Sequence, residues 1–151
     1  MPLTEKEYEE LVELVCDIVN TSDPDQEYEN SLCHKNLFKQ LDWLCLKYGE
    51  LPDLLSIRAD HIELIGQRLE LYERAIDLAE NLEDYANITQ SVESIIQIYI
   101  DEQPNYDNAS RWFEKLESAV SKYGDEYITT SLSETKAQIM RLKISSAHWN
   151  Q

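Results

Sequence analysis

The sequence predicts an all-α fold of about seven helices in a single domain that spans residues 1–151. Apolar residues recur at three- and four-residue spacing along most of the chain, which is the period of an amphipathic helix. Only three glycines and four prolines occur, and most of them fall between the periodic stretches. No alternating run bounded by hairpin turns is present, and the β-branched stretch IIQIYI is embedded in a longer helical pattern.

The first 49 residues predict two helices joined by one long connection. Thr4 and Glu7 form a capping-box pattern that opens an acidic N-terminal helix within about residues 1–22. The apolar face of this helix comprises Tyr8, Leu11, Val12, Val15, Ile18 and Val19. After the polar stretch NTSDPDQ, Pro24 suits the first turn of a second helix, and Gly49 suits its end, so residues 25–49 form the next unit.

The rest of the chain predicts two further hairpin units and a closing helix. In unit 50–82, Pro52 begins one helix, and Gly66 allows a tight reversal into the next. In unit 84–124, the turn DEQPNYD separates two helices, and the second ends at Gly124. The last helix, which starts at Asp125 or as late as Ser131, covers residues 125–148 and caps the stack.

A near-repetition indicates that the helices form repeated hairpins. KYGE (47–50) and KYGD (122–125) both close apolar stretches, and Phe38 and Leu41 correspond to Phe113 and Leu116 at the same offset of 75. Tyr72 and Ala75 lie between the two copies, 34 residues after Phe38. This pattern predicts three aromatic-plus-apolar pairs on the second helices of successive hairpins; the alternative is a non-repetitive helical bundle that uses the same residues as core.

Two helices per unit with a period of 34 resemble the tetratricopeptide repeat. In the best unit, residues 90–123, five positions match the motif's large, aromatic and small positions: Ile96, Ile100, Tyr106, Ala109 and Phe113. Leu116, Gln97 and Glu93 depart from the motif. The resemblance implies stacked antiparallel hairpins wound into a right-handed superhelix.

The resemblance also implies a binding site, because the first helix of each hairpin lines the concave groove in that family. The groove positions implied are Glu50, Asp53, Ile57, Asp60 and His61 in one unit, and Ser91, Ser94, Ile98, Asp101 and Glu102 in the next. Such a groove is acidic, so it suits a basic domain or a Lys/Arg-rich peptide rather than a partner's terminal carboxylate. Candidate aromatic contacts, with core burial as their alternative, are Tyr28, Tyr85, Tyr127 and Trp149.

The net charge of the chain also favours a basic partner. The chain has 30 acidic and 13 basic residues, a net charge of −17. Residues 1–30 contain ten acids and only Lys6, whereas residues 127–151 contain Glu134 against Lys136, Arg141 and Lys143. A surface of this sign disfavours direct binding of nucleic acid or an anionic membrane. Steering of a cationic partner and simple solvation of an acidic face are both compatible with it.

The sequence contains no recognisable constellation for catalysis, a metal or a cofactor, and we expect none of the three. The three cysteines, Cys16, Cys33 and Cys45, each lie in an apolar-periodic stretch, so we expect buried free thiols. Cys33-His34 beside Cys45 has no CxxC pair for zinc. His61 follows Asp60 directly, and adjacent helical residues point about 100° apart, so we expect His61 at the surface. No membrane span or signal sequence is expected, which favours the cytoplasm.

Three functional hypotheses follow. The first is a non-enzymatic inhibitor of a basic protein, as an immunity protein against a cationic toxin would be. The second is a small chaperone or adaptor that holds an extended client, similar to the acidic tetratricopeptide chaperones of bacterial secretion systems. The third is an enzyme with an unrecognised site.

Overall fold

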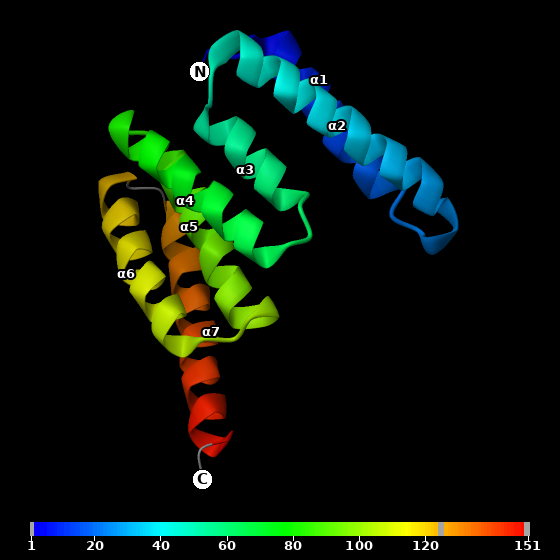
Figure 1. The fold of residues 1–151 in the computed structure, drawn as a ribbon. Helices are drawn as coiled ribbons and strands as arrows, with labels where there is room; N and C mark the ends of the chain where they lie inside the picture. Colours follow the sequence, from blue (N-terminus) through cyan, green and yellow to red (C-terminus); the bar gives the residue numbers. More distant parts are fainter. Residues whose placement is uncertain (1, 124–125, 150–151) are drawn as a thin grey trace.

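The computed structural model describes residues 2–123 and 126–149, and in these ranges all regular secondary structure is helical (Figure 1). This confirms the predicted all-α class with about seven helices packed in chain order. The α-helices are α1 (Glu5–Asn20), α2 (Glu27–Tyr48), α3 (Pro52–Asp60), α4 (Ile65–Asn81), α5 (Tyr85–Gln97), α6 (Tyr106–Tyr123) and α7 (Glu126–Trp149). A 3-10 turn, η1 (Pro24–Gln26), precedes α2, and a π-helix, η2 (Ile98–Glu102), extends α5. Superhelical winding stays a prediction.

Helices α1 and α2 form an antiparallel hairpin. Side-chain hydrogen bonds join Glu7 to Lys47, Glu10 to Gln40 and Asn30 to the carbonyl of Ile18, so early residues of α1 meet late residues of α2. Between the helices lies a small core made of Leu3, Leu11, Ile18, Leu37, Leu41 and Leu44, closed by Leu54 of α3. Residues 25–49 thus contain one α-helix, and its hairpin partner is α1.

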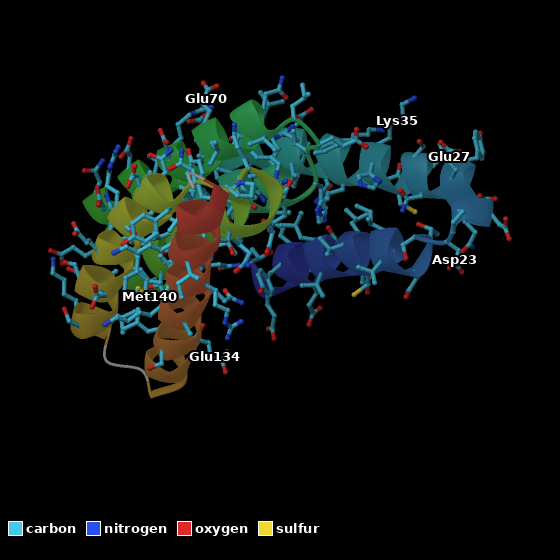
Figure 2. The ribbon with its side chains drawn as sticks, turned by 90° about the horizontal axis from the view of Figure 1, so that it is seen from below. Asp23, Glu27, Lys35, Glu70, Glu134 and Met140 are labelled. Atoms are coloured by element: carbon cyan, nitrogen blue, oxygen red, sulfur yellow. The ribbon has the colours of Figure 1, made fainter. Side chains whose placement is uncertain are left out.

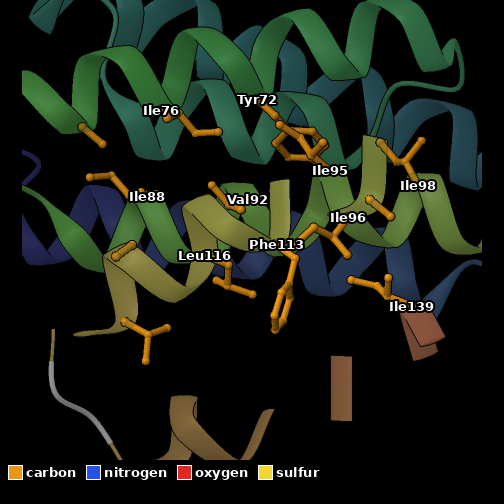
Figure 3. Packing of buried hydrophobic residues seen from close by; sticks show 14 of the residues in the cluster. Tyr72, Ile76, Ile88, Val92, Ile95, Ile96, Ile98, Phe113, Leu116 and Ile139 are labelled. Carbon is orange, nitrogen blue, oxygen red and sulfur yellow. The ribbon is translucent and has the colours of Figure 1, made fainter. Parts of the chain in front are cut away.

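Helices α3 to α7 form the body of the molecule around a second, larger core. This core gathers apolar residues of α4, α5 and α6, together with Ile139 of α7 (Figure 3). Tyr72 and Phe113, two of the predicted repeat aromatics, both lie in it, and Ala75 and Ala109 are fully buried. Phe38 lies elsewhere: it is partly buried against the core of the α1–α2 hairpin. The body is therefore one packed unit to which the hairpin is attached through α3.

Helix ends follow the local sequence where a cap or a glycine is present. Thr4 caps α1 as predicted: its hydroxyl accepts from the Glu7 amide while the Glu7 carboxylate accepts from the Thr4 amide. Gly49 ends α2 with φ of 79°, a left-handed conformation that favours glycine. The predicted stop at Gly124 and start at Asp125 lie outside the described residues.

Two helix boundaries differ from the prediction. The reversal expected at Gly66 lies earlier, because α3 ends at Asp60 and α4 already begins at Ile65. The helix expected to run through Ile100 changes to π geometry at Ile98, where the Gln103 amide donates to the Ile98 carbonyl at 2.8 Å. This turn places Glu102 beside Arg68 of α4.

The hairpin projects away from the body, so the molecule is elongated (Figure 1). At the other end, the C-terminal half of α7 extends past the helices that surround its first half. The three cysteines are free, but the expectation of buried thiols is wrong for Cys16, which is exposed on α1. Cys33 and Cys45 are half-buried, and burial raises the pKa of the Cys45 thiol.

Candidate functional site

The groove positions predicted around α3 are only partly open. Glu50 is exposed, but its carboxylate forms an ion pair with Arg74 of α4. Asp53 is half-buried; burial raises the pKa of its carboxyl group, and a hydrogen bond from Asn87 opposes that rise. Ile57 is half-buried and packs against the core of the α1–α2 hairpin. Each of these side chains is thus already engaged within the chain.

Asp60 and Glu102 come together around two side chains of α4. The buried Tyr72 hydroxyl donates a hydrogen bond to Asp60, and Nη1 of Arg68 donates to both oxygens of Glu102 at 2.6 and 2.8 Å. Burial raises the pKa of Asp60, and the Tyr72 hydrogen bond and the Arg68 charge oppose that rise. Burial also raises the pKa of Tyr72, and Asp60 adds to this effect. The arrangement is a network whose negative charges are met internally.

The remaining α5 and η2 positions are dispersed. Ile98 is 1% exposed because it continues the apolar face of Ile95, so it belongs to the core and does not line a groove. Ser94 is half-buried and donates to a backbone carbonyl of its own helix, and Ser91 is buried. Asp101 is exposed and accepts a hydrogen bond from Gln97 at 2.7 Å. The structure therefore does not assemble the predicted residues into one free acidic groove.

His61 lies where the hairpin meets the body. Its ring is half-buried, contrary to the expected surface position, and stands edge-on to His34 of α2 with the ring centres 5.9 Å apart. Burial lowers the pKa of His61, His34 lowers it further, and Asp60 opposes both. Nδ1 of His34 donates to the Asn30 carbonyl at 2.9 Å. A neutral His61 at neutral pH fits this apolar junction.

The acidic residues of the first thirty positions form a surface that sequence reasoning counted but did not place. Glu5, Glu9, Glu13 and Asp17 recur at four-residue spacing, so they form one acidic edge of α1. The hairpin's far end carries four more acids, including Asp23 and Glu27, and extends beyond the body (Figure 2). All eight are exposed, and none forms an ion pair within the described part of the chain.

Beside the acidic edge, α1 exposes apolar side chains. Tyr8, Val12 and Val19 are 46%, 45% and 64% exposed. A groove of about 210 Å³ separates this face from α3. Its lining, which defines the α1–α3 groove, is Tyr8, Leu11, Val12, Val15, Cys16, Ile57, Asp60 and His61. The helical periodicity predicted the apolar face of α1, and α2 covers only the side of it that carries Leu11 and Ile18.

Glu7 fixes the start of α1 against the end of α2. Lys47 donates to its carboxylate at 2.6 Å and Tyr48 at 2.7 Å, and the Thr4 amide donates as well. These hydrogen bonds, with Lys47 contributing most, lower the pKa of Glu7 to about 2. A carboxylate that stays charged in this position holds the hairpin closed at its base.

The aromatic residues predicted as candidate contacts lie in different environments. Tyr28 is 73% exposed near the hairpin's end, whereas Tyr85 packs partly buried against the body core. The side chains of Tyr127 and Trp149 lie outside the described residues. Within the described ranges, no group of three or more metal-ligating side chains is found, and no helix is long and apolar enough to span a membrane.

Comparison with protein-family models, curated proteins and solved structures found no match for the chain.

Proposed function

We propose that this protein is a non-enzymatic binding module that uses the acidic α1–α2 hairpin to bind a basic partner protein. The observation that supports this most is the concentration of eight exposed acids, unpaired among the described residues, on a hairpin that projects from the body. The groove predicted around α3 and α5 offers less free negative charge, because Arg74 already pairs with Glu50 and Arg68 with Glu102.

Physical chemistry favours a cationic partner for this hairpin. Like charges at four-residue spacing repel one another, so a partner that brings Lys or Arg side chains relieves repulsion and gains attraction. Complementary charge also accelerates encounter and suppresses wrong partners. The apolar face of α1 next to the acidic edge supplies the area that such contacts need for affinity.

The most specific form of the proposal is an immunity-type inhibitor, which covers the positive active site of a toxin domain. A projecting acidic hairpin suits insertion into a cationic cleft. The alternative is a small tetratricopeptide-like adaptor that holds a client segment, and the α1–α3 groove supports it because the groove is apolar and open. The two differ in the client: an inhibitor needs a folded toxin domain, whereas an adaptor also binds short fragments.

The test uses a triple charge reversal, Glu9→Lys/Glu13→Lys/Asp17→Lys, on the acidic edge of α1. A matched control, Glu70→Lys/Glu73→Lys/Asp77→Lys, changes the net charge equally on the exposed side of α4. Each tagged chain captures proteins from the source cells at low and high salt, and the captured protein is then purified and titrated by calorimetry.

We expect the wild type and the α4 control to bind one basic protein with equal affinity, and the α1 variant to bind at least about tenfold more weakly, about 1.4 kcal/mol. An equal loss of affinity in both variants would show that binding depends on net charge alone. Unchanged affinity in both variants would show that the hairpin does not contact the partner. Inhibition of the captured protein's enzymatic activity supports the inhibitor form, and competition by its short fragments supports the adaptor form.

A further inference from the structure

The C-terminal half of α7 carries an exposed apolar stripe with basic borders. Met140 and Ile144 are 46% and 58% exposed. One turn from Met140 on the same face lies Lys136, and Lys143 and Arg141 lie on the two sides of the stripe. Ile139 and Leu142 face the body core, so the stripe lies on the opposite, solvent side of the helix. Figure 2 shows α7 with Met140 on it at the outside of the body.

This stripe is the counterpart of the exposed face of α1. Each has apolar side chains along its middle, and the borders differ in sign: Lys and Arg on α7, Glu and Asp on α1. The two segments also have the same length, since Tyr8 to Val19 and Lys136 to Ala147 each contain twelve residues, which extend over about 16 Å of helix. In one chain the end of α7 points away from α1 (Figure 1), so both faces stay uncovered.

We propose that the α7 stripe of one copy docks on the α1 face of a second copy, with Lys136 and Lys143 opposite the acidic edge of α1. Burial of Tyr8, Val12, Met140 and Ile144 supplies the hydrophobic gain. Charge pairing sets the orientation. A reciprocal exchange closes a dimer, and a one-way contact builds longer chains.

The contact is weak and concentration-dependent. One helix on another buries less than the area of a standard stable interface. In addition, every copy carries a net charge of −17, so copies repel one another at long range. Salt near 0.15 M limits that repulsion to about 8 Å while local pairs persist. This inference involves the same face of α1 as the proposed function but a different occupant. The two are tested separately because the borders of α7 take part only in self-association.

The test is a charge exchange between two full-length variants. Glu9→Lys/Glu13→Lys reverses the α1 edge, and Lys136→Glu/Lys143→Glu reverses the α7 borders. Sedimentation velocity follows the mass of each chain from about 10 to 300 µM, the range of a weak complex. Circular dichroism verifies that each variant retains its helicity. The control Glu70→Lys/Glu73→Lys changes net charge as the α1 variant does, on α4.

We expect the wild type and the α4 control to associate with rising concentration, each exchanged variant alone to associate at least about tenfold more weakly, and their equimolar mixture to associate again. A wild type that stays monomeric at the highest concentration would overturn the proposal, as would a mixture that stays dissociated. Binding of the basic partner by the α7 variant, measured in dilute solution where the wild type is monomeric, keeps the two proposals separate: it equals that of the wild type if only self-association is lost.

Discussion

Replacement of Leu41 by alanine tests the packing of the α1–α2 hairpin directly. Leu41 is fully buried in the hairpin core. Removal of a buried leucine side chain to alanine costs its transfer free energy and leaves a cavity, together about 3–4 kcal/mol of unfolding free energy. With a urea dependence near 2 kcal/mol per molar, the unfolding midpoint falls by about 1.5–2 M.

A matched control lies on the same helix. Leu46 is 87% exposed, and Leu46→Ala makes the same chemical change where no packing is lost, so its effect stays within about 0.5 kcal/mol. Urea unfolding of both variants is followed by circular dichroism at 222 nm and by tryptophan fluorescence, to which Trp43, on α2 between the two sites, contributes together with Trp112 and Trp149. Equal midpoints for Leu41→Ala and Leu46→Ala would refute the described burial of α2.

Two titratable groups give the remaining predictions. The pKa of Glu7 in the folded chain is about 2 against an ordinary value of 4.5, so its charge stabilises the fold above pH 4.5 and this stabilisation is lost as pH falls toward 2. Glu7→Gln should lower the urea midpoint at pH 7, and its midpoint should differ much less from that of the wild type near pH 2. The control is Glu9→Gln at an exposed position. A difference in midpoint that does not shrink as the pH falls would contradict the lowered pKa of Glu7. Tyr72→Phe removes the hydrogen bond that lowers the pKa of Asp60, so an NMR titration should find that pKa higher than in wild type, and an unchanged or lower value would show that the contact is not made.

Local chemistry made several helix ends predictable. Thr4 and Glu7 satisfy each other's backbone amides, which is a short-range signal contained in four residues. Gly49 adopts a left-handed conformation that few other residues tolerate. The end of α3 at Asp60 has no comparable signal, since neither glycine nor proline lies between Asp60 and Ile65. Helix α3 packs against α4 and α5, and such packing is not visible in a local pattern.

The repeat pattern was a good guide to which helices pair. It was a poorer guide to the surroundings of each aromatic residue. Tyr72 and Phe113 share the body core with Ala109, and Ala75 is also fully buried on α4. Phe38 belongs to the hairpin and lies under the Arg58 guanidinium, 5.5 Å from its ring centre. The same repeat alignment implies the groove residues, and it does not include the arginines of α4. Arg68 and Arg74 therefore neutralise carboxylates that the register assigned to an open acidic groove.

Helix α1 shows most clearly what periodicity leaves open. The spacing of Tyr8, Val12 and Val19 indicates a face that loses free energy in water, but it does not state which surface covers that face. Helix α2 is already occupied by Leu11 and Ile18, so the cover has to come from another molecule or not at all. Because the face has an acidic border, a surface that covers it is expected to be basic. The stripe on α7 of a second copy is one such basic surface. If α7 and a basic partner protein both bind there, the Lys136→Glu/Lys143→Glu variant should bind the partner as tightly as wild type in dilute solution and more tightly at concentrations where the wild type self-associates.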